Sequence, residues 1–329
     1  MKKSILAVLA LLLVAGNCYA EDFSTALAKT MSQIPDGADV AGMGNASTAT
    51  PEFSSRNPAI IAVESKEKFN ASGTATYGLI NFSNGPKIDL YSVSGTFKLP
   101  VGAMQINLSN AGSNVGAVDE MTDAQFNSAP SINLQYGLKL GKNVLADDDS
   151  LYGGVSYSYG TSKITMHVAD PILGDIFDIT KSTSKEVGLG ALYQFGVVNV
   201  GAFYAHSWDS ADEYINDALD NTTKSQTDTL RLGLGVHVTS STYVAMDYRH
   251  LYLPNGEHDD QYYIGLEQYI IKDVLALYAG YADGGATAGV GIYGKSCGLN
   301  LGYMHRPFRA TEEVFGKAEV FMLSIYGTF

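Results

Sequence analysis

The side chains best suited to acid-base chemistry are histidines that stand close to aspartates in the sequence. They form two groups, His206 with Asp209 and Asp212, and His250 and His258 with Asp259 and Asp260. Such pairs can move protons during hydrolysis. The sequence lacks, however, a nucleophile elbow, a spaced metal-ligand triad and a phosphate-binding loop. It therefore predicts no enzymatic activity, no metal site and no cofactor.

Acidic runs and cysteines are the other chemically distinctive residues. The acidic runs are Asp209 to Glu213, Asp217 to Asp220 and Glu257 to Asp260. They lack the glycine and spacing of an EF-hand, so we interpret them as solvated loops that could touch divalent cations at a lipopolysaccharide surface. Cys18 and Cys297 are the only cysteines. Since Cys18 lies in a targeting signal, no internal disulfide or thiolate zinc site is expected.

The elements that would position these side chains are β-strands. Beyond residue 65, many segments of about ten residues alternate apolar with small or polar residues, which is the period of a strand with two different faces. Clear examples are 185–195 and 228–238. The alternation predicts about 14 strands, which are 68–80, 88–99, 101–109, 131–141, 150–161, 185–195, 197–207, 228–238, 242–252, 260–270, 274–282, 286–294, 296–306 and 318–329.

The connections between these strands indicate a transmembrane antiparallel β-barrel. Tight turns alternate with longer polar stretches, which are 110–130, 162–184, 208–227 and 307–317. A soluble β-sandwich would also alternate polar and apolar residues. A tilted bilayer crossing needs about ten residues per strand, and short turns at one rim with long loops at the other are typical of outer-membrane barrels. The terminal Phe329 on an apolar stripe resembles their assembly signal, so chaperones and the barrel assembly machinery of the periplasm are expected partners.

Aromatic residues are expected at the two membrane interfaces of such a barrel. We predict these girdles from residues near strand ends. The candidates are Trp208, Tyr243, Tyr248, Tyr262 or Tyr263, and Tyr303.

Composition agrees with an uncharged barrel wall. The chain has 329 residues, 17% of them charged, with a net charge of −13 and 35 glycines. An acidic chain is a poor partner for a phosphate backbone, so nucleic acid is excluded as a partner. The mean hydropathy of +0.01 would suit a soluble protein. In a barrel, that value averages an apolar outer face and a polar inner face.

The first 20 residues have the features of a secretory signal peptide. Lys2 and Lys3 precede an apolar core from Ile5 to Ala15, and Cys18-Tyr19-Ala20 offers small residues for cleavage after Ala20. Lipid attachment at Cys18 is an alternative that Asn17 disfavours. The expected location is the bacterial outer membrane, in contact with its lipid and lipopolysaccharide.

Strand parity predicts which polar side chains face the lumen. If Leu230, Val244, Leu266 and Leu301 face lipid, no charge stands on the lipid face, where it would cost about 2–4 kcal/mol. The lumen-facing polar residues are then Arg231, His237, Asp247, Arg249, Glu267 and Asn300. They could form an internal ion-pair ladder or be ordinary lumen residues. Inward glycines, which include Gly188, Gly190, Gly233, Gly235, Gly298 and Gly302, would leave room for a segment inside.

Residues 21–64 do not follow the strand rhythm. They contain a glycine-punctuated stretch, Gly37 to Ala46, and an Asn57-Pro58 step, which favours a fixed turn. We therefore predict three parts, a signal peptide (1–20), an N-terminal hatch or plug (21–64) inside the lumen and the barrel (65–329).

Two motifs in the predicted hatch resemble the FadL family of outer-membrane transporters for long-chain fatty acids and other hydrophobic compounds. They are Gly42-Met43-Gly44-Asn45-Ala46 and Ser55-Arg56-Asn57-Pro58-Ala59-Ile60-Ile61. The resemblance implies a 14-stranded barrel with an N-terminal plug. It also implies passive uptake, in which a hydrophobic molecule reaches a pocket against the hatch and leaves sideways through a gap in the wall. Asn57, Pro58 and Ala59 would then gate the hatch, and Gly42 and Gly44 would pack it closely.

Two other functions remain open at this point. A general diffusion porin for small polar solutes would have the same strands and an open lumen. A barrel that does not transport and serves as a partner in secretion or assembly shares a similar glycine and Asn-Pro-Ala pattern.

Overall fold

The structure is a computed structural model. The predicted signal peptide, its cleavage site and Cys18 lie outside the described residues. The described residues are 33–50, 56–64, 71–85, 87–113, 116–117, 122–170, 174–253, 256, 258–308, 312 and 316–329.

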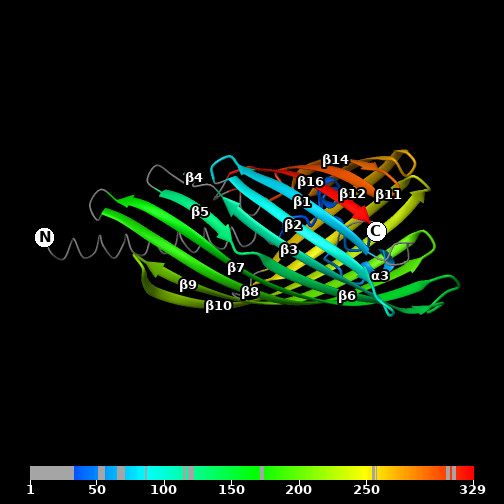
Figure 1. Cartoon of the computed structure of the whole chain (residues 1–329), viewed down its shortest axis with the longest axis horizontal. Coiled ribbons are helices and arrows are strands. Elements are labelled where there is room, and N and C mark those ends of the chain that lie inside the picture. Colours follow the sequence, from blue (N-terminus) through cyan, green and yellow to red (C-terminus); the bar gives the residue numbers. More distant parts are fainter. Residues whose placement is uncertain are drawn as a thin grey trace.

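The described chain forms a closed antiparallel β-barrel, as the sequence predicted (Figure 1). Fourteen strands run around it, and the pairings β1–β16 and β2–β3 complete the circle. The short strands β4 and β5 belong to the same sheet, in which β5 pairs with β3, β4 and β7. The strands of the first half are β1 (Ala71–Phe82), β2 (Lys87–Lys98), β3 (Ala103–Ser113), β4 (Gly116–Ala117), β5 (Thr122–Ser128), β6 (Ser131–Lys142), β7 (Ser150–Asp170) and β8 (Gly174–Phe195).

The second half of the barrel is built from a regular up-and-down series. Each of its strands pairs with the next one in the sequence. They are β9 (Val198–Ile215), β10 (Ala218–Thr239), β11 (Thr242–Tyr252), β12 (His258–Ile271), β13 (Leu275–Ala282), β14 (Gly285–Tyr293), β15 (Cys297–His305) and β16 (Ala318–Thr328). Two short helices precede the strands, α2 (Ala38–Gly42) and α3 (Ile61–Glu64). No helix among the described residues has the length and apolar character of a membrane span.

Side chains alternate between the two faces of the wall, as the period of two requires. On β10, Leu232 and Leu234 are exposed on the outer face, whereas Arg231 and Gly233 are buried on the inner face. Large apolar side chains are exposed on the outside of nearly every strand. Apolar surface on this scale is what a bilayer covers in a membrane barrel.

Three stretches predicted as long loops contain paired strands. Residues 162–170 belong to β7 and 174–184 to β8, residues 208–215 belong to β9 and 218–227 to β10, and the end of β3 with β4 and β5 lies within 110–130. In Figure 1 the two long hairpins extend well beyond the rest of the barrel. The polarity of both faces misled the interpretation, because strand pairing outside a bilayer does not need an apolar face. Asn216 and Asp217 close β9–β10 with φ angles of 48° and 66°, which suits a two-residue hairpin turn.

The girdle prediction is wrong at Tyr243, and of the alternatives Tyr262 and Tyr263 only Tyr262 lies on the outer face. Tyr243 and Tyr263 are both 2% exposed and face inward, because they share parity with the lumen-facing residues of β11 and β12. Trp208 and Tyr262 are exposed on the outer face. Tyr248 and Tyr303 also lie on the outer face, where their hydroxyls donate hydrogen bonds to Asp260 and Glu319 at 2.6 and 3.1 Å.

The outer end of β8, close to the tip of the β7–β8 hairpin, carries a carboxyl group that should make this hairpin sensitive to pH. Burial and the charges of Glu213 and Asp220 raise the pKa of Asp178 from 3.8 to about 6. Between these two values the folded hairpin binds more protons than the unfolded one, so its free energy of unfolding falls as the pH rises from 3.8 to about 6. Above a pH of about 6, Asp178 is ionised in both states and the free energy of unfolding no longer falls because of it.

We expect Asp178→Asn to remove this loss. At pH 7.5, amides of the hairpin tip should exchange hydrogen more slowly in the variant than in the parent chain, whereas at pH 3.5 the two should exchange alike. Comparison at equal pH cancels the intrinsic pH dependence of exchange. Equal exchange rates of the two proteins at pH 7.5 would contradict the prediction.

Candidate functional site

Residues 33–50 and 56–64, called here the N-terminal segment, lie inside the barrel. Helix α2 contacts β13, β14, β15 and β16, whereas α3 contacts β3, β6 and β7 on another part of the wall. Nearly all of the segment is buried. Figure 1 shows it in blue within the strands. The lumen is therefore occupied on one side by chain from outside the sheet.

Asp247 of β11 binds this segment at its centre. One carboxylate oxygen, Oδ2, accepts hydrogen bonds from the backbone N–H of Ser47 (3.0 Å), the N–H of Thr48 (2.8 Å) and the hydroxyl of Thr48 (2.6 Å). Asp247 is 4% exposed. Hydrogen bonds to a buried charge are stronger than neutral ones. Asp247 is thus the main polar link between the segment and the β9–β11 wall.

Asn57 links three parts of the chain. Its Nδ2 donates to the carbonyl of Thr48 at 2.9 Å and to the carbonyl of Ala191 in β8 at 3.0 Å. Its Oδ1 accepts from the N–H of Ala59 at 3.1 Å, which fixes the turn at Pro58. The side chain is 1% exposed. The predicted gating residue therefore ties both stretches of the segment to the wall.

Glycines stand at many of the positions where the barrel wall contacts the segment. A Cβ on Gly201 would lie 2.1 Å from the carbonyl oxygen of Thr48, and one on Gly233 would lie 2.9 Å from the N–H nitrogen of Ala49. Only glycine permits such an approach of two backbones. Backbone atoms of the segment also lie against Gly137, Gly154, Gly265, Gly280, Gly289 and Gly302, whereas Gly190 lies against the side chains of Asn57 and Pro58.

Many of these glycines stand beside one another on paired strands. Gly137 pairs with Gly154, and Gly154 pairs with Gly190. The pairs Gly201–Gly233, Gly265–Gly280 and Gly289–Gly302 continue around the barrel. We call these nine residues the glycine belt. Of the inward glycines considered from the sequence, Gly190, Gly233 and Gly302 belong to it. Gly188 and Gly298 instead contact side chains of the wall, and Gly235 lies against Tyr243 and the carbonyl of Ala49.

The remaining predicted hatch residues lie on this belt. Gly42, at the end of α2, lies against Gly289, and Gly44 has a φ of 65°. Because left-handed backbone favours glycine, Gly44 allows the chain to turn away from α2. Pro58 and Ala59 cover Gly154, and Ala59 has no exposed surface.

The structure brings together only some of the predicted lumen-facing polar residues. Arg231 and Arg249 are directly paired across β10 and β11, and Asp247 is paired with Gly233 one step away. All three are buried. Arg249 donates a 3.0 Å hydrogen bond to Gln261. The others lie apart: His237 packs against the Tyr243 ring, Glu267 is paired with Tyr243 and Tyr278, and Asn300 is paired with Ser324.

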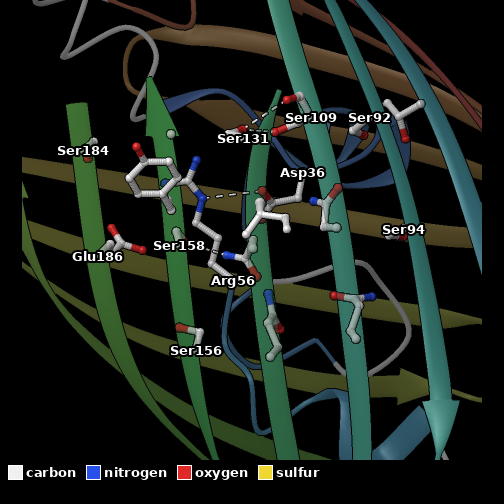
Figure 2. Close-up of a pocket in the computed structure, with 18 of the residues that line it drawn as sticks. Asp36, Arg56, Ser92, Ser94, Ser109, Ser131, Ser156, Ser158, Ser184 and Glu186 are labelled. Atoms are coloured by element: carbon white, nitrogen blue, oxygen red, sulfur yellow. Dashed lines mark hydrogen bonds and ion pairs between the residues drawn. The ribbon is translucent and has the colours of Figure 1, made fainter. Parts of the chain in front are cut away.

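A cavity of about 300 Å³ lies beside the segment, against the wall formed by the strands from β1 to β8 (Figure 2). Hydroxyl and amide side chains supply most of its lining. These are Thr74, Thr76, Ser92, Ser94, Gln105, Asn107, Ser109, Ser131, Asn133, Gln135, Ser156, Ser158 and Ser184.

Charged groups border the same cavity. Asp36 and Arg56 of the N-terminal segment form an ion pair, with 3.5 Å between Arg56 Nε and Asp36 Oδ1. Glu186 of β8 also lines it and accepts a 3.2 Å hydrogen bond from Ser207. Figure 2 shows the Arg56 side chain directed toward Asp36.

The wall is irregular next to this cavity. The β3–β6 ladder ends at the pair Ser109–Ser131. Beyond it along β3, this strand has a single backbone pairing with β5, between Gly112 and Asn127. Side chains replace the missing ladder there, since Ser128 accepts from the N–H of Ala111 and Ser113 accepts from the N–H of Phe126, each at 2.6 Å. We call this part of the wall the β3–β5 seam.

Sequence reasoning missed the cavity. A signal was present, because the inward positions of β2, β3, β6 and β7 carry serine, asparagine or glutamine in alternation. It could not be interpreted without knowing which part of the lumen the segment leaves free. Arg56 was noted only as part of a motif.

The histidine groups lie on the outer face rather than around a cleft. His206 pairs with Asp228 at 2.7 Å and not with Asp209 or Asp212. His250 lies 2.6 Å from Asp260. Within the part of the chain that the structure describes, no three His, Cys, Asp or Glu side chains are grouped as metal ligands.

Solved structures with a similar fold include a toluene transporter, a monoaromatic hydrocarbon channel and a FadL homologue. The toluene transporter TodX of Pseudomonas putida is 12% identical, with 90% of this chain and 99% of that chain covered and a TM-score of 0.58. The CymD monoaromatic hydrocarbon channel is 12% identical, with coverage of 90% and 98% and a TM-score of 0.60. A Pseudomonas aeruginosa FadL homologue is 12% identical, with coverage of 89% and 98% and a TM-score of 0.53.

These likenesses confirm, at the level of the fold, the resemblance predicted from the sequence. No family model matches the chain, and no curated protein matches it.

Proposed function

We propose that this protein is a passive channel for small uncharged molecules in a bacterial outer membrane. The observation that carries the proposal is a closed barrel, apolar outside, whose lumen holds a packed segment with a cavity beside it. A bilayer is spanned only by helices or by barrels without edges, because backbone polar groups cannot be left unpaired in hydrocarbon. Transport through such a barrel needs no energy-coupling site.

Two substrate classes are supported by different observations. Hydrophobic compounds are the class predicted from the sequence, and the similar barrels TodX and CymD are a toluene transporter and a monoaromatic hydrocarbon channel. Small polar solutes, as in a diffusion porin, are supported by the hydroxyl and amide lining of the cavity. In both cases the N-terminal segment acts as the hatch, and Asn57, Pro58, Ala59, Gly42 and Gly44 hold it in place.

Uptake into cells tests the channel function directly. A Gram-negative host without channels of this kind would express the protein, and entry of radiolabelled small neutral compounds would be measured. We expect entry to increase at least severalfold over cells with an unrelated barrel of equal abundance. No increase for any compound, together with copurification of a stoichiometric protein partner, would favour the non-transporting alternative.

The exit route can be tested in the same cells. We propose that hydrophobic cargo leaves through the β3–β5 seam, and cysteines at Gly112 and Asn127, in a Cys297→Ser background, would staple that seam when oxidised. The control pair is Gly95 and Ile106, which are also paired but lie on the regular β2–β3 ladder. Oxidation should lower uptake only in the seam variant. Equal uptake in oxidised and reduced seam variants would exclude this route.

A further inference from the structure

The chemistry of the cavity is narrower than that of a general channel. Seven serines and two threonines line it, together with asparagine and glutamine. Pockets for hydrocarbon are lined mainly by apolar and aromatic side chains, with few polar groups. A hydrocarbon here would remove water from many polar groups and return no hydrogen bond.

Two side-chain carbonyl oxygens in this wall accept no hydrogen bond from the described part of the chain. Asn107 Oδ1 and Asn133 Oδ1 are buried and accept no hydrogen bond from any residue that the structure describes. The amide nitrogen of Asn133 is already used, since it donates to Ser158 at 2.7 Å. Buried polar atoms in folded proteins nearly always have a partner. Both oxygens are closed off from the cavity in this structure, and rotation of each amide toward the cavity would let a molecule there donate to it.

The charges around the cavity disfavour an anion. The guanidinium of Arg56 is paired with Asp36, so it is not free to bind a carboxylate or phosphate. Glu186 adds a further negative charge to the lining. A neutral molecule avoids repulsion from Glu186 and leaves the Asp36–Arg56 pair intact.

From these observations, we propose that the cavity takes small neutral molecules that carry hydroxyl groups. Each hydroxyl can donate to Asn107 or Asn133 and can both donate to and accept from the serines. Two sources share this chemistry, namely polyols and aromatic alcohols. The inference rests on the proposed channel function, and it excludes bare hydrocarbons as preferred cargo.

Matched compounds separate these possibilities. Uptake of toluene, benzyl alcohol and erythritol would be compared in cells that express the protein. A site built to bond a hydroxyl rejects an analogue that lacks it, so we expect the protein-dependent uptake of at least one alcohol to exceed that of toluene by about tenfold or more. Preference for benzyl alcohol identifies aromatic alcohols, and preference for erythritol identifies polyols.

Variants in the wall test the two oxygens. Asn107→Leu and Asn133→Leu should each lower alcohol uptake about fivefold or more and shift the preference toward toluene. Asn81→Leu is the matched control, because Asn81 lies on the outer face of β1 and outside the cavity. Heat-modifiable migration on gels, which reports a closed barrel, would confirm folding of each variant.

The outcomes distinguish the inference from the function on which it rests. Toluene uptake equal to or above that of both alcohols would overturn the inference and leave the channel function intact. Absence of uptake for all three compounds would overturn both. Loss of alcohol uptake in a folded Asn81→Leu variant as large as that in Asn107→Leu would also overturn the inference, because the effect would not then depend on the cavity.

Discussion

Replacement of Asp247 by alanine is expected to release the N-terminal segment and to increase the flux of small solutes through the barrel. The variant loses all three hydrogen bonds that hold Ser47 and Thr48. Hydrogen bonds to charged groups contribute about 1.5–3 kcal/mol each. A net loss of about 3 kcal/mol would raise the displaced fraction of the segment roughly a hundredfold.

Swelling of vesicles that contain the purified protein measures this effect. Asp260→Ala is the control, because Asp260 is a carboxylate of the next strand that accepts its bonds from Tyr248 and His250 on the outer face. Asn57→Ala should act in the same direction as Asp247→Ala. Unchanged swelling in a folded Asp247→Ala barrel, with no gain of protease cleavage between residues 33 and 64, would show that other contacts hold the segment.

The second large effect is expected at the glycine belt. In Gly201→Ala, the new methyl group would lie 2.1 Å from the carbonyl oxygen of Thr48, a backbone atom that cannot rotate away. Overpacking of this kind costs about 1–3 kcal/mol. We expect the 47–49 stretch to leave the wall and solute flux to rise on the order of tenfold.

Gly73→Ala provides the matched control for this variant. Gly73 is also a strand glycine, but its nearest neighbour would be the carbonyl oxygen of Ser94 at 3.6 Å, which is an ordinary contact distance. Its flux should equal that of the parent chain. If both variants behave alike, the effect belongs to any strand glycine and the belt has no special role in seating the segment.

The sequence predicted the strands of the wall well, because each strand is marked locally by alternating apolar and polar residues. Strand β11 spans the predicted 242–252, and β6 and β13 differ from prediction by one residue at one end. The prediction was weakest in the long hairpins, where the alternation of apolar residues stops although the ladder continues. A bilayer imposes an apolar face, and strands beyond the bilayer have no such requirement.

The candidate site was predictable only in part. Gly42, Gly44 and the Asn57-Pro58-Ala59 turn stand out locally, because their backbone properties do not depend on distant residues. Asp247 was assigned to the lumen from parity, but its bonds to Ser47 and Thr48 join residues about 200 positions apart. No local pattern indicates such a partner.

The sequence by itself determined that strands of period two form an edgeless wall with one apolar and one polar face. This follows from side-chain alternation and from the cost of unpaired backbone in hydrocarbon. Only the tertiary structure decided where the N-terminal segment rests and, with that, which inner surface stays free. The glycine belt accepts the segment because backbone can approach backbone there. The serine-rich wall from β1 to β8 is left to line the cavity.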